Sequence, residues 1–136
     1  VAKLAGTLDQ DTLMELREMA HLYPEPAQTP EEEKEQHISS LMFHSRLADV
    51  AENELLGFIV SFMARILSDL TVYRRLYATP NRELWERGRK HQIDLVEALA
   101  SGDGDRARAI MTSHMEGAER MMNQQEMRIA RQFMAE

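Results

Sequence analysis

The sequence contains no cysteine, which excludes disulfides and every reaction that needs a thiolate. This absence agrees with a reducing, cytoplasmic location. Positive charge is also scarce, because 16 Lys and Arg stand against 23 Asp and Glu and give a formal net charge of -7. Nucleic acids and anionic membranes are bound by basic faces, so the composition argues against direct binding to either. No apolar run reaches the about 18 residues of a membrane span, and the first residues lack the layout of a signal peptide.

Strand signals are missing too, since apolar and polar residues do not alternate between turn signals anywhere. Apolar residues instead recur at helical spacing along 136 residues, a length that fits one domain. Breaks are expected at Tyr23-Pro24-Glu25-Pro26, at Ala78-Thr79-Pro80-Asn81 and at Ser101-Gly102. The prediction is an all-α fold, an antiparallel helical bundle with short connections. The expected helices cover residues 8–22, 30–52, 54–77, 82–100 and 103 onward.

Several helix starts can be located from their capping residues. Thr7 and Gln10 have the spacing of a capping box, which predicts the start of the first full helix. Thr29, followed by Pro30 and three glutamates, has the cap, the first-turn proline and the acidic first turn of a helix. Asn53 is expected to cap the helix after it.

The helix expected after Asn53 is apolar around most of its circumference, which is typical of a helix enclosed by others. We therefore expect it to be the central element of the bundle, with His44 brought toward it on the preceding helix. A pocket, if the bundle has one, should lie near His44. The apolar residues of the expected central helix are Leu55, Leu56, Phe58, Ile59, Phe62, Met63, Ile66, Leu67 and Leu70.

The histidines are the residues that most suggest chemistry. His37, His44, His91 and His114 lie on three expected helices, and neutral imidazoles from several helices of a bundle can meet on one metal ion. The alternative is that they are scattered surface or core-edge residues. None of these four has a Glu three residues before it, which argues against a di-iron carboxylate site. No Gly-x-Ser-x-Gly motif or glycine-rich loop is present, so we expect no enzyme.

Arg65 and Asp69 are four residues apart and are among the few polar positions of the expected central helix. An arginine in a mostly enclosed helix can receive a carboxylate through two hydrogen bonds. The alternative is an ion pair on a solvated stripe.

The order of these signals resembles the C-terminal effector-binding (FCD) domain of FadR-like GntR transcription regulators. The resemblance covers nearly the whole chain and implies about five of the six or seven helices of such a domain, with residues 1–5 matching the end of its first helix. It also implies a homodimeric bacterial regulator whose N-terminal winged helix-turn-helix, which is not in this sequence, binds operator DNA. The matching residues are Phe43-His44-x-x-Leu47-Ala48-x-x-Ala51-x-Asn53-x-x-Leu56 and Leu95-Val96-Glu97-Ala98-Leu99-x-x-Gly102-Asp103-x-x-x-Ala107-x-x-x-Met111-x-x-His114-Met115.

Many members of that family hold a divalent metal such as zinc or nickel, through an Asp and three histidines, and an organic acid completes the coordination. Here His44 and His114 match the first and last histidines, but Ser40 stands at the Asp position and Gln92 at the middle histidine, with His91 beside it.

An incomplete ligand set favours a metal-free pocket. In that pocket, the effector-binding residues are expected to be His44, Arg65, Gln92 and His114. The alternative is a metal-dependent enzyme or metal-binding helical bundle that uses His44, His91 and His114.

Overall fold

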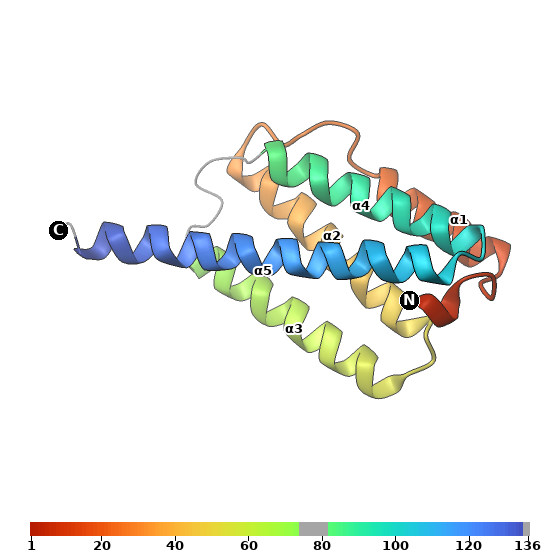
Figure 1. Ribbon diagram of the computed structural model, residues 1–136. Coiled ribbons are helices and arrows are strands. Elements are labelled where there is room, and N and C mark those ends of the chain that lie inside the picture. Colours follow the sequence, from red (N-terminus) through yellow and green to blue (C-terminus); the bar gives the residue numbers. More distant parts are fainter. Residues whose placement is uncertain (74–81, 135–136) are drawn as a thin grey trace.

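The computed structural model describes residues 1–73 and 82–134, and these residues form an all-helical bundle without strands (Figure 1). The all-α prediction is confirmed. None of the described helices is long and apolar enough to cross a membrane. The elements are a short 3-10 helix at Ala2–Leu4, then α1 (Gln10–His21), α2 (Pro30–Asp49), α3 (Glu54–Tyr73), α4 (Arg82–Ala100) and α5 (Gly104–Met134).

Two of the predicted caps are formed as expected. The hydroxyl of Thr29 accepts a hydrogen bond from the backbone N–H of Glu32 at 3.2 Å. The side-chain oxygen of Asn53 accepts one from the N–H of Leu56 at 2.9 Å. α2 ends at Asp49, slightly earlier than predicted. The predicted break at residues 78–81, and the predicted end of the third helix, lie outside the described residues.

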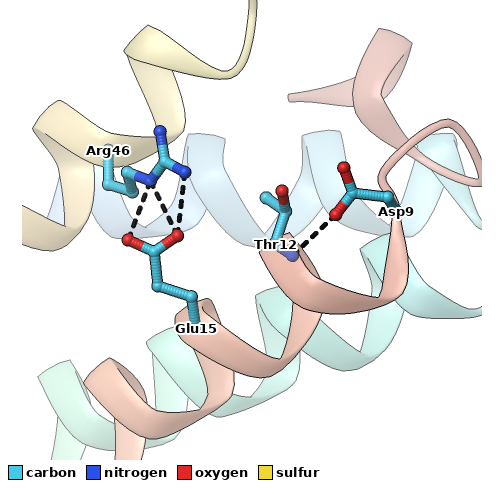
Figure 2. A network of polar contacts seen from close by, with 4 residues as sticks. All are labelled: Asp9, Thr12, Glu15 and Arg46. Atoms are coloured by element: carbon cyan, nitrogen blue, oxygen red, sulfur yellow. Dashed lines mark hydrogen bonds and ion pairs between the residues drawn. The ribbon is translucent and has the colours of Figure 1, made fainter.

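The predicted capping box at the start of α1 is wrong. The cap is Asp9, whose carboxylate accepts a hydrogen bond from the N–H of Thr12 at 2.7 Å (Figure 2). This bond lowers the pKa of Asp9. The hydroxyl of Thr7 instead donates to the carbonyl of Leu4 at 3.0 Å, because Thr7 still belongs to the turn that follows the 3-10 helix. Asp and Thr are both good caps, so their spacing alone did not decide between them.

The buried core lies where α1, α2, α4 and α5 meet. In Figure 1, α4 lies beside α5 and next to α1, while α2 passes behind them. Apolar side chains at helical spacing on these four helices account for the enclosure. The largest fully buried side chains are Phe43, Leu16, Leu95, Leu99 and Val96.

α3 is not the enclosed central helix that its composition predicted. It makes most of its contacts with α2, and Figure 1 shows it at the side of the bundle. Phe58 is 68% exposed and Phe62 is 53% exposed. The reason is that only one side of α3 finds a neighbour among the described helices. A contiguous apolar surface of this kind usually marks an interaction site.

Two glycines hold the N-terminal segment against the turn between α4 and α5. Gly6 and Gly102 both have φ of +74°, in the left-handed region that favours glycine. A Cβ built on Gly6 would lie 3.4 Å from the Cα of Gly102. The N–H of Gly6 also donates to the carbonyl of Leu99 at 3.0 Å. The segment before α1 is therefore joined to the end of α4 by backbone contacts.

An ion pair links α1 to α2 on the surface. The guanidinium of Arg46 donates to both carboxylate oxygens of Glu15, with Nη2 to Oε2 at 2.8 Å and Nε to Oε1 at 2.9 Å (Figure 2). Because both side chains are more than a third exposed, solvent screening limits the contribution of this pair to about 0.2–1 kcal/mol. It joins the surfaces of the two helices, while the core supplies most of the stability.

We expect Leu95→Ala to lower the free energy of unfolding by about 2–5 kcal/mol, because Leu95 is fully buried and its truncation leaves a cavity. The matched control is Leu22→Ala, which removes the same atoms from a side chain that is 58% exposed. Its effect should stay within about 0.5 kcal/mol. Urea unfolding measured by circular dichroism checks both values, and equal losses would contradict the position of the core.

Candidate functional site

Three histidines from three helices come together in the bundle. His44 lies on α2, His91 on α4 and His114 on α5. The ring centroids of His91 and His114 are 3.8 Å apart, those of His44 and His114 are 5.0 Å apart, and those of His44 and His91 are 6.2 Å apart. We call these three residues the histidine cluster. Of the other two histidines, His37 lies two turns earlier on α2, and His21 is exposed on α1.

The helical spacing of core residues places each ring of the cluster. Phe43 is fully buried, so its neighbour His44 is held at the edge of the core, where the two rings meet edge to face at 5.8 Å. His91 precedes the buried Leu95 by four residues and therefore lies on the same face of α4. On α5, His114 follows the buried Ala107 by two turns of the helix.

The rings of the cluster are uncharged at neutral pH. Burial, followed by the charge of His114, lowers the pKa of His44 to about 4. Burial and the other two rings lower the pKa of His91 to about 3, against a smaller opposing effect of Asp94. Burial also lowers the pKa of His114. Each neutral ring offers one hydrogen-bond donor and one acceptor.

One of these polar atoms has no partner in the described part of the chain. His91 is only 8% exposed, and its Nε2 is buried without a hydrogen bond. A buried polar group without a partner is costly, so such an atom is commonly explained by a ligand, an ion or an ordered water. The site can therefore donate to, or accept from, a polar group placed between the helices.

Gln92, which is expected to bind the effector together with His44 and His114, follows His91 on α4. Its side chain is 8% exposed, and its amide nitrogen donates to the hydroxyl of Ser40 at 2.9 Å. Arg65 is exposed on α3. His91, which is expected only as a metal ligand of the alternative site, lies in the histidine cluster. The four-residue spacing to Leu95 places His91 on the core side of α4, but Gln92 has the same spacing to the buried Val96, so this signal does not separate the two residues.

The arrangement does not fit the metal site that the family resemblance implies. A metal ion lies in the plane of each imidazole that binds it, about 2.0–2.1 Å from the nitrogen. The planes of His91 and His114 are stacked with only 12° between them, so one ion cannot lie in both. Ser40 also supplies no carboxylate. No group of three His, Asp or Glu side chains within residues 1–73 and 82–134 is placed to hold a metal ion.

We expect the free energy of unfolding to fall as the pH is lowered from 6.5 toward about 4. In the unfolded chain, histidine binds its proton near pH 6.5, whereas the folded protein keeps His44 and His91 neutral down to a pKa of about 4 and about 3. The unfolded state then binds more protons, so each histidine contributes a slope of up to about 1.4 kcal/mol per pH unit.

Urea unfolding at several pH values measures this slope. His91→Asn should flatten it, while His21→Asn, which removes an exposed ring, should follow the wild type. A profile of the His91→Asn variant that runs parallel to the wild type would show that burial does not lower the pKa of His91 in the folded protein.

Comparison with known proteins gives one family. The family model described as "FCD domain" matches residues 1–117, which is most of the chain. No curated protein and no solved structure matches it. FCD domains are ligand-binding domains of GntR-type regulators, and they are helical bundles like the one described above. From its sequence match and its fold, the chain belongs to the FCD domain family.

Proposed function

We propose that the chain, residues 1–136, is the ligand-sensing and dimerisation domain of a cytoplasmic GntR-family transcription regulator. It binds a small organic acid or a related metabolite at the histidine cluster and has no catalytic activity. The observation that carries this proposal is the meeting of three neutral imidazoles from α2, α4 and α5, one of them with a buried and unpartnered Nε2. Membership of a ligand-binding domain family supports it.

The position of the cluster suits a sensor. A ligand that hydrogen-bonds to His44, His91 and His114 connects three helices, so it favours the arrangement of those helices that binds it best. Regulation then requires that this arrangement also changes the spacing of DNA-binding domains, which is a coupling between two sites. Operator DNA is bound by a winged-helix domain, in agreement with the net charge of -7 on this chain.

The proposed site works through hydrogen bonds, without a metal ion. The stacking of His91 on His114 and the Ser40–Gln92 hydrogen bond both support this form of the site over the metal-binding alternative. Elemental analysis of the purified, untagged protein distinguishes the metal-free site from the metal-binding one. One equivalent of zinc or nickel that is lost in a His44→Ala/His114→Ala variant would show that the rings rotate to bind an ion.

We expect small carboxylic acids to raise the melting temperature of the wild type, and this rise to be lost in the His44→Ala/His114→Ala variant. A thermal-shift screen of acetate, glycolate, succinate and citrate measures it. His91→Asn serves as a second variant that keeps a polar side chain of smaller volume, and His21→Ala is the control outside the cluster. If the double variant keeps the full response, the ligand site lies elsewhere and the proposal fails.

We expect the protein to form a homodimer that uses the exposed apolar face of α3. Phe58 and Phe62 stack on that face with ring centroids 6.0 Å apart, and both are more than half exposed. Light scattering after gel filtration should give twice the chain mass of 15.7 kDa. Phe58→Glu/Phe62→Glu should give the monomer mass, because buried unpaired carboxylates are costly. The control Met14→Glu, on the exposed side of α1, should stay dimeric.

A further inference from the structure

Two arginines from neighbouring helices lie over the same glycine. Gly117 is buried on α5, and a Cβ built on it would lie 3.4 Å from Nη2 of Arg87 and 3.9 Å from Nη2 of Arg120. Arg87 comes from α4 and Arg120 from α5. Both guanidinium groups therefore lie within 4 Å of one point, although like charges repel each other.

Each guanidinium has a loose ion-pair partner on its own helix but no hydrogen bond to it. Arg87 is 3.7 Å from a carboxylate oxygen of Glu83, and Arg120 is 4.0 Å from one of Glu116, so both pairs are beyond hydrogen-bond distance. By contrast, Arg82 contacts Glu86 on the same helix at 2.8 Å. Both guanidinium groups thus keep N–H donors for another anion, and their side chains are 54% and 62% exposed, which leaves them within reach of solvent.

The two arginines lie directly beside the histidine cluster. Arg87 precedes His91 by four residues on α4, and Gly117 follows His114 by three residues on α5, so each shares a helix face with its histidine. α4 and α5 run antiparallel from a tight turn (Figure 1). Arg87 and Gly117 therefore lie at one level of the helix pair, and His91 and His114 lie at the next level. The two levels are separated by about one helical turn, roughly 5.4 Å.

We infer that Arg87 and Arg120 form an anion clamp that holds the carboxylate of the ligand, while the histidine cluster binds a second polar group of the same molecule. This inference rests on the proposed function and assigns the part of the site that recognises charge. The ligand class that fits is a short acid with a hydroxyl, carbonyl or second carboxyl group a few bonds from its carboxylate.

The clamp supplies what the histidine cluster lacks. Neutral imidazoles offer hydrogen bonds but no positive charge, and a carboxylate that leaves water needs a cation or several donors. Guanidinium groups match a carboxylate with two parallel N–H donors each. Gly117 has no side chain, so the two guanidinium groups can lie close to the backbone of α5.

The test uses isothermal titration of the wild type with glycolate, succinate and citrate at low ionic strength, because salt screens half-exposed charges. Arg87→Gln and Arg120→Gln should each weaken binding of the best of these acids by about tenfold to a hundredfold. Arg106→Gln is the matched control, since it removes the same charge from an exposed position near the other end of α5. The affinity of the Arg106→Gln variant for the same acid should stay within about twofold of that of the wild type. Glycolamide and succinamide, which lack the negative charge, should not bind.

The outcomes separate the clamp from the proposed function. If the acids bind the wild type and both arginine variants equally, or if Arg106→Gln weakens binding as much as the other two, the clamp is overturned and the histidine site stands. If the neutral amides bind as well as the acids, the clamp is overturned as well. If no acid binds the wild type, the proposed carboxylate site fails together with the clamp. Circular dichroism melts of each variant confirm that the fold is kept.

Discussion

The burial of Phe43 is the constraint on which the site depends. Its ring is fully enclosed by the core, which sets the rotation of α2 about its own axis relative to the rest of the bundle. That rotation holds the next residue, His44, at the edge of the core and against the other two rings of the histidine cluster. In this position the His44 ring is removed from water, which lowers its pKa and keeps it neutral. Packing therefore determines both where the imidazoles are and how they are charged.

Most of the fold follows from local signals in the sequence. Capping residues such as Thr29 and Asn53, and the apolar spacing on α4, are properties of a few neighbouring residues, and the structure agrees with them. The cap of α1 differs because two suitable residues, Thr7 and Asp9, lie close together and only the path of the preceding turn selects one.

The site is less predictable, because it depends on helix rotation and on which partner each polar group finds. The family resemblance places Gln92 at the middle histidine position of the site. The amide of Gln92 instead finds the hydroxyl of Ser40, and His91 faces the cluster. Composition likewise shows that α3 is apolar on nearly all sides, but it does not show whether another helix of the chain packs against each side. Phe58 is exposed, so none of the described helices packs against that side of α3.

The contact between Gly6 and Gly102 has a mechanical consequence. The two backbones pack directly against each other, so no flexible side chains lie between them that could adjust to a shift of either segment. We therefore expect the turn between α4 and α5 and the segment after the 3-10 helix at Ala2–Leu4 to shift together if the ends of these helices are displaced. An alanine at either position would be strained by the positive φ, and this strain would act against the joint between the two segments.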